Sequence, residues 1–147
     1  MSLPSQLQNC VASGVIVADS ILGEACNHLE FLGYKVEQET DCVFVSEPAR
    51  FSWMLKDFRG GVMFRKSFPA SEGGRERPEA LLALSNRMNT DAGLLRTYVD
   101  AQGDLAIEAW FPNLYERRSF GRFVMALETE LRELLSRCRA EVSAVLS

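Results

Sequence analysis

The spacing of apolar residues changes several times along the chain, and each spacing predicts one kind of element. From Ser13 to Gly33, apolar residues recur every three or four positions, as on one face of an amphipathic helix. Gly33 follows the last of these residues and suits the position after a helix end, where glycine is favoured. A first helix is therefore predicted over residues 13–33.

The spacing then shortens to two residues. Between positions 34 and 46, Val36, Cys42 and Phe44 alternate with acidic residues, which is typical of a half-buried strand. Residues 51–58 and 62–68 show further strand patterns and are separated by short turns. Because such short connections join antiparallel neighbours, a three-stranded antiparallel meander is predicted.

A polar connection and a second helix follow. Residues 69–77 are rich in glycine and charge and have no period, which predicts an exposed, flexible loop. Pro78 suits the first position of a helix that should end near Asn89. Its predicted buried stripe consists of Leu81, Leu84 and Met88. Two segments, 94–100 and 105–111, then predict a β-hairpin whose turn needs Gly103.

The last predicted element is a long C-terminal helix. It should begin after Ser119 as N-cap and run close to Leu146, a length of about 40 Å at the rise of an α-helix. Its apolar positions step by three and four, as in a heptad repeat. Since the outer end of so long a helix extends beyond a small sheet, a second copy of the chain is the simplest partner for it; the alternative is that this end frays. The residues predicted to form that dimer contact are Leu127, Leu131, Leu134 and Cys138.

This order of elements predicts an α+β fold with helices packed on one antiparallel sheet. The 147 residues suit a single domain, 1–147, in which residues 1–12 are expected to be a disordered tail. A net charge of −4 gives no electrostatic reason to bind nucleic acid, and no apolar run approaches the roughly 18 residues of a membrane span. The four cysteines include no C-x-x-C pair, so reduced thiols and a cytoplasmic location are expected.

Candidate reactive groups are few. His28 is the only histidine, and Cys26 diverges from it on the predicted helix, which disfavours a shared metal ion. His28 is also the only imidazole available to a cysteine nucleophile. The row Glu37, Glu39 and Asp41 could perform acid–base chemistry, although a water-facing strand is the favoured interpretation.

The glycines and arginines of "EGGRERPEA" precede a predicted helix start, where anions can bind. The stretch lacks the lysine and hydroxyl of a P-loop, so a solvated loop is favoured. We therefore predict no catalytic residue, no metal and no cofactor.

Aromatic residues are the more informative set. Those on predicted strands or at strand ends are Phe51, Trp53, Phe58, Phe64, Phe68, Tyr98, Trp110 and Phe111. If helices cover only one face of the sheet, some of these rings form an apolar contact surface on the other; ordinary core packing is the alternative. The residues predicted to bind a peptide or protein partner are Trp53, Met54, Phe64 and Trp110.

The stretch "LLALSNRMNTDAGLLRTYVDAQGDLAIEAWFP" places Asn86 and Asn89 at a helix end, Asp100 at a strand end and Gly103 in a turn. Together with the order of elements from about Ser20 to Leu135, it resembles the YbjN family of candidate bacterial sensory-transduction regulators. That family shares its fold with the class I type III secretion chaperones. The resemblance implies a cytoplasmic, non-enzymatic protein, often a homodimer, that binds an extended peptide of another protein. The long C-terminal helix departs from the compact chaperones.

Three functions remain open at this point. The first is a peptide-binding, chaperone-like module. The second is a homodimeric regulatory or structural protein with no client. The third is a small-molecule sensor or enzyme, which would need a closed pocket where groups such as Arg65, Glu108 and His28 converge.

Overall fold

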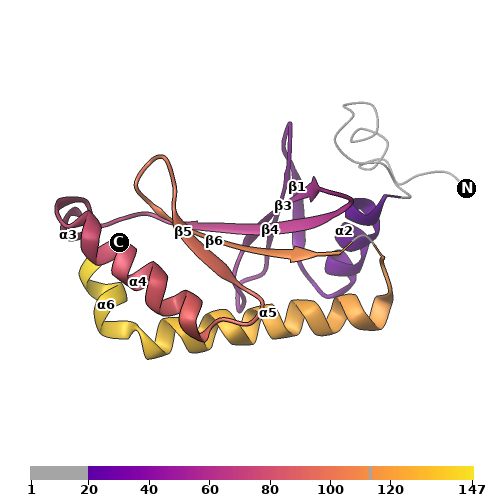
Figure 1. Cartoon of the computed structure of the whole chain (residues 1–147). Coiled ribbons are helices and arrows are strands. Elements are labelled where there is room, and N and C mark those ends of the chain that lie inside the picture. The colour runs from indigo at the N-terminus through magenta and orange to yellow at the C-terminus, as the bar shows by residue number, and fades with distance from the viewer. Residues whose placement is uncertain (1–19, 113) are drawn as a thin grey trace, which may run out of the picture. The chain divides into compact units, whose positions relative to one another are not determined.

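The computed structural model describes residues 20–112 and 114–147 and has the predicted α+β fold, with helices and an antiparallel sheet (Figure 1). The sheet has six strands in the order β1-β2-β3-β4-β6-β5. The predicted tail over 1–12 and the predicted helix start at 13–19 lie outside the described residues. In chain order the elements are α2 (Ile21–Phe31), β1 (Lys35–Gln38), β2 (Val43–Ser46), β3 (Trp53–Phe58), β4 (Gly61–Phe68), α3 (Glu72–Glu76), α4 (Pro78–Asp91), β5 (Arg96–Val99), β6 (Leu105–Phe111), α5 (Arg117–Arg137) and α6 (Arg139–Val145).

Contacts divide the chain into two compact units. Unit 1 contains the described residues up to Phe64 together with Trp110–Val124, and unit 2 contains Arg65–Ala109 and Met125–Ser147. Strands β4 and β6 and helix α5 contribute residues to both units. A single domain over the whole chain stays a prediction.

In unit 1, the first predicted helix is confirmed over its described part. The Ser20 side chain accepts a hydrogen bond from Gly23 N at 3.1 Å and caps the start of α2. Gly33 follows the helix with φ 98°, a conformation that glycine adopts without strain. The buried positions of α2 are Leu22, Gly23, Ala25, Cys26 and Leu29.

The single strand predicted over 34–46 is wrong. The segment is a hairpin of β1 and β2, closed by a hydrogen bond from Glu39 N to Cys42 O of 2.9 Å, so the meander has four strands. The turn changes which residues face the core, because Val43 is buried and Phe44 is exposed. The predicted acidic row is also wrong, since Glu39 and Asp41 lie in the turn rather than beside Glu37 on one strand.

In unit 2, the loop predicted over 69–77 contains helix α3. Ser71 caps it by accepting from Gly74 N at 3.2 Å, and Ser71 N donates to Val145 O at 2.9 Å. Gly74 is buried so close to α6 that an added Cβ would lie 2.2 Å from Val145 O. The absence of a hydrophobic period misled the prediction, because this short helix packs through glycine instead of apolar side chains.

The second helix and the hairpin of unit 2 follow the sequence pattern. Helix α4 begins at Pro78, and its buried positions include the three predicted ones, Leu81, Leu84 and Met88. β5 pairs antiparallel with β6, and Gly103 has φ 82° in their connection. These elements are confirmed.

The C-terminal helix differs from its prediction at both ends. It begins at Arg117, because the Glu116 carboxylate accepts hydrogen bonds from Arg118 N (3.0 Å) and Ser119 N (2.7 Å), so Ser119 is not the N-cap. The helix breaks at Cys138 (φ −102°, ψ 22°), and α6 turns back against α3 and α4 (Figure 1). The C-terminal end of the predicted helix therefore packs within unit 2, as α6, and does not need a second copy of the chain to cover it.

The predicted dimer contacts lie inside the chain's own core. Leu127, Leu131, Leu134 and Cys138 are each 0–1 % exposed. The heptad spacing correctly indicated that one face of the helix is buried, but spacing alone does not say which surface buries it. These four residues therefore offer no surface to a partner.

Candidate functional site: the open sheet face of unit 1

The sheet of unit 1 has one face that packs against helix α5. Trp53 is 3 % exposed and its ring centroid lies 6.2 Å from that of Phe64, which is 1 % exposed. Phe64 in turn contacts Phe120 and Phe123 of α5, at 6.1 and 5.4 Å between centroids. Trp53 and Phe64 are thus core residues, and the prediction that they bind a partner is corrected.

The other two predicted partner-binding residues point to the opposite face. Met54 neighbours Trp53 on β3, and successive side chains of a strand point to opposite faces. Trp110 likewise precedes Phe111, whose ring contacts Phe120, so its indole lies on the face away from α5. Trp110 is 46 % exposed, which is unusual for so large an apolar side chain.

Phe44 joins this face, although its alternation with acidic residues in the sequence predicts a buried position. It lies directly opposite Met54 in the β2–β3 register and is 43 % exposed. Phe58 also lies on β3, on the same face as Met54, and continues the row. We call Phe44, Met54, Phe58 and Trp110 the open-face patch.

The indole of Trp110 is held in place. Its Nε1 donates to Phe58 O at 2.9 Å, and the ring lies against Gly61, where an added Cβ would be 2.5 Å from Nε1. That Cβ would also lie 2.1 Å from Phe111 O, so only glycine fits there. A rigid, exposed tryptophan loses little conformational entropy when it binds, which favours it as an anchor for a partner.

The open-face patch has a basic rim. Lys56 Nζ lies 6.0 Å from the Phe58 ring centroid, and Arg59 Cζ lies 5.2 Å from the same centroid. Both cations therefore sit beside apolar surface, where a partner's acidic side chain could reach them. The acidic Glu37 of β1 stands opposite Phe44 in the β1–β2 register.

Arg65 and Glu108 are two of the polar groups that a small-molecule pocket would require, and they lie near enough for the charge of Arg65 to act on the Glu108 carboxylate. Glu108 is 7 % exposed, and its carboxylate accepts from Arg96 Nη2 at 2.6 Å and from the Tyr98 hydroxyl. Burial raises the pKa of Glu108, but the hydrogen bonds from Tyr98 and Arg96 and the charges of Arg96 and Arg65 outweigh it and leave the pKa below its usual value. A carboxylate so fully paired is unsuited to general acid catalysis.

His28 lies in unit 1, whereas Arg65 and Glu108 lie in unit 2. Its Nδ1 lies 2.9 Å from the Tyr115 hydroxyl, and its ring is 5.1 Å from that of Phe120. Burial, followed by the charge of Arg117, lowers the pKa of His28. This arrangement anchors the segment before α5 to α2.

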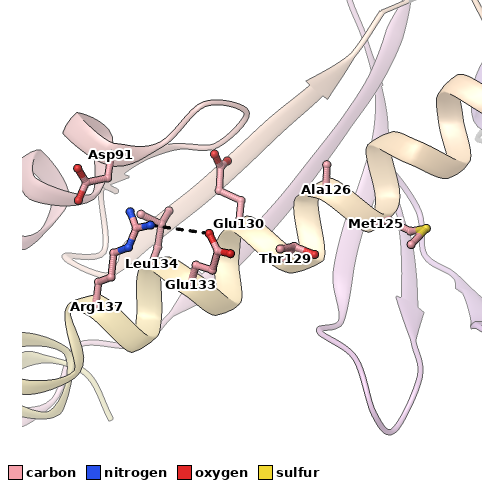
Figure 2. Close-up of a pocket in the computed structure, with 8 residues that line it drawn as sticks. All are labelled: Asp91, Met125, Ala126, Thr129, Glu130, Glu133, Leu134 and Arg137. Carbon is pink, nitrogen blue, oxygen red and sulfur yellow. Dashed lines mark ion pairs between the residues drawn. The ribbon is translucent and has the colours of Figure 1, made fainter.

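Grooves lie along α5 and between α4 and α6 in unit 2. The larger, of about 370 Å³, follows α5 from Met125 to Arg137 and ends at Asp91 of α4 (Figure 2). Its Glu130 accepts from the backbone of Gly93, Leu94 and Leu95, and its Arg137 pairs with Glu133 at 4.0 Å. The other groove, of about 310 Å³, is lined mainly by small and apolar residues of α4 and α6.

Other chemistry weighed from the sequence finds little support in the part of the chain that the structure describes. Over 20–112 and 114–147, no three metal-binding side chains gather. Cys26, Cys42 and Cys138 are free thiols, while Cys10 lies outside the described residues. In the stretch proposed for anions, Arg75 is paired with Asp104 at 3.0 Å.

The fold has a counterpart among solved structures. It is similar to that of YbjN from E. coli, a candidate transcription regulator by its description. The two structures superpose with a TM-score of 0.69 and 14 % sequence identity, over 86 % of this chain and 95 % of that chain. No protein-family profile matches the sequence, and no curated protein does. The similarity therefore shows the fold that the sequence resemblance implied, while membership of the YbjN family remains a proposal.

No helix in the described part of the chain combines the length and apolarity needed to cross a membrane.

Proposed function

We propose that this protein is a non-enzymatic, YbjN-like regulatory or chaperone-like protein that binds an extended segment of another protein on the open-face patch. The exposed, immobilised indole of Trp110 beside Phe58 is the observation that carries the proposal. Tryptophan is the residue type most enriched among binding hot spots, and a neighbouring apolar row gives it a continuous contact surface.

The chemistry of the patch defines the segment it would bind. Phe44, Met54 and Phe58 offer apolar contacts, and Lys56 and Arg59 border them with positive charge. An extended segment places alternate side chains on one side, so apolar residues at every second position with an acidic residue among them would match. The YbjN-like fold supports a regulatory role in place of an enzymatic one.

A peptide-display selection against the full chain tests this function. The enriched peptides should alternate apolar residues and carry Asp or Glu. Trp110→Ala should weaken binding of a selected peptide by about tenfold or more, as for a hot-spot residue. Lys56→Glu should also weaken binding of the selected peptide. The loss of affinity should grow as the salt concentration falls, because repulsion between like charges is then less screened.

The matched control is Leu82→Ala, which truncates a side chain of α4 in unit 2 that is also exposed. It should leave the affinity unchanged. Thermal unfolding of each variant shows whether the fold is kept. Selected peptides that bind the folded Trp110→Ala and wild-type proteins equally would contradict the proposal.

A further inference from the structure

The two terminal strands of the sheet are β5, in unit 2, and β1, in unit 1. On β5, the Asn89 side chain donates to Thr97 O and accepts from Thr97 N, and Glu130 accepts from Leu95 N. Side chains of unit 2 therefore close this edge against another strand. The opposite edge of the sheet is β1, in unit 1, whose Lys35 and Glu37 side chains are exposed.

The register shows which groups of β1 face outward. Glu39 N donates to Cys42 O, and the pairs alternate along the strand between hydrogen-bonded and non-hydrogen-bonded ones. Glu37 and Lys35 therefore bond toward β2, opposite Phe44 and Ser46. The N–H and C=O of Val36, between them, point away from β2 and toward the open side of the edge.

The charges on β1 are complementary to themselves. Lys35 and Glu37 are 73 % and 54 % exposed and lie on one face of the strand, with 2.7 Å between Nζ and Oε1. If two β1 strands pair antiparallel about Val36, Lys35 of each copy stands opposite Glu37 of the partner subunit. These positions would form non-hydrogen-bonded pairs, in which opposite side chains approach most closely.

We propose that two copies of this chain associate by pairing β1 with β1 about Val36, with Lys35 and Glu37 fixing the register. The pairing makes one two-fold interface, in which both copies use the same residues. If the register slipped by one residue, Lys35 of one copy and Glu37 of the partner subunit would lie on opposite faces of the sheet. The charges therefore select one alignment. Since Phe44 lies beside Glu37, the open-face patches of both copies would border the seam.

Charge reversal tests this pairing independently of peptide binding at Trp110. The association of the full chain is measured by analytical ultracentrifugation over a range of concentrations. Lys35→Glu and Glu37→Lys should each weaken it by about tenfold or more, because each places two like-charged pairs across the seam. An equimolar mixture of the two variants should restore it, since each strand then faces the opposite charges.

The mixture distinguishes the seam from a change within one chain. In each single variant, residues 35 and 37 of the same chain carry like charges and repel each other. Mixing the two variants leaves this repulsion within each chain unchanged. Arg139→Glu, an exposed charge reversal on α6, is the control and should not alter association. Thermal unfolding confirms that every variant is folded.

Three results would overturn the proposal. One is a wild-type chain that stays monomeric, and another is a pair of single variants that associate as wild type does. The third is a mixture that remains as weakly associated as its components. If the chain is monomeric and the amides of β1 gain protection from hydrogen exchange only when a selected peptide binds, the edge belongs to a client strand instead.

Discussion

The side-chain amide of Asn89 pairs with both backbone groups of Thr97, donating from Nδ2 to the carbonyl at 3.0 Å and accepting from the N–H at 2.7 Å. It thereby copies the two hydrogen bonds that a neighbouring strand would make. The Thr97 hydroxyl continues the network to the Ser85 hydroxyl, 2.7 Å away in the interior. A residue that the sequence pattern indicated only as a helix end therefore ties α4 to the outer edge of β5.

Replacing Asn89 with alanine should lower the free energy of unfolding by about 1–3 kcal/mol, because both backbone groups of Thr97, which is buried, lose their partner. Urea unfolding measures the change. Asn86→Ala, three residues earlier on the exposed face of α4, is the matched control and should change stability by less than about 0.5 kcal/mol. Equal effects from the two substitutions would show that the amide clamp contributes nothing specific.

Glu130 should be more important than its half-buried position on α5 suggests. Its carboxylate accepts three consecutive backbone N–H groups, those of Gly93, Leu94 and Leu95. Glu130→Gln keeps the shape but turns one acceptor oxygen into a donor, so we expect a loss of about 1–3 kcal/mol in the free energy of unfolding. Glu133→Gln, one turn along, removes only an exposed ion pair and should cost less than about 1 kcal/mol. A harmless Glu130→Gln in urea unfolding would contradict this role.

Two glycine substitutions should act in opposite directions. Gly61→Ala places a Cβ within 2.5 Å of the Trp110 indole and 2.1 Å of Phe111 O, so it should destabilise the fold and shift the fluorescence of the displaced Trp110. Gly121 lies inside α5, and a Cβ there would meet only the His28 ring at an ordinary 3.7 Å. Gly121→Ala should therefore stabilise the protein by up to about 1 kcal/mol through helix propensity. Unfolding curves that move in the same direction for both would refute the geometry at Gly61.

The single histidine makes the stability of the protein depend on pH below about pH 6.5. Burial and Arg117 lower the pKa of His28 below 6.5, so the unfolded chain binds a proton more readily than the folded chain. Its contribution to stability is complete above pH 6.5 and is lost as the pH falls from 6.5 through the lower folded pKa. The wild-type free energy of unfolding should therefore decline over this range relative to that of His28→Gln. Parallel pH profiles for the two proteins would show that His28 titrates alike in both states.

The order of elements could be predicted because it depends on local patterns. The three-and-four spacing of Leu81, Leu84 and Met88 and the turn glycine Gly103 are readable from neighbours in the sequence alone. The hairpin of β1 and β2 was missed because a polar turn between two short strands leaves an apparently unbroken alternation. Because of this turn, Val43 is buried and Phe44 is exposed.

The sequence by itself determined the α+β architecture and the presence of a surplus of aromatic residues on the strands. Only the tertiary structure decided which of them are accessible, since alternation divides a strand into two faces without saying which one a helix covers. It placed Trp53 and Phe64 beneath α5 and left Met54 and Trp110 on the other side. It also turned α6 back against α4, because the break at Cys138 depends on packing between residues far apart in the chain.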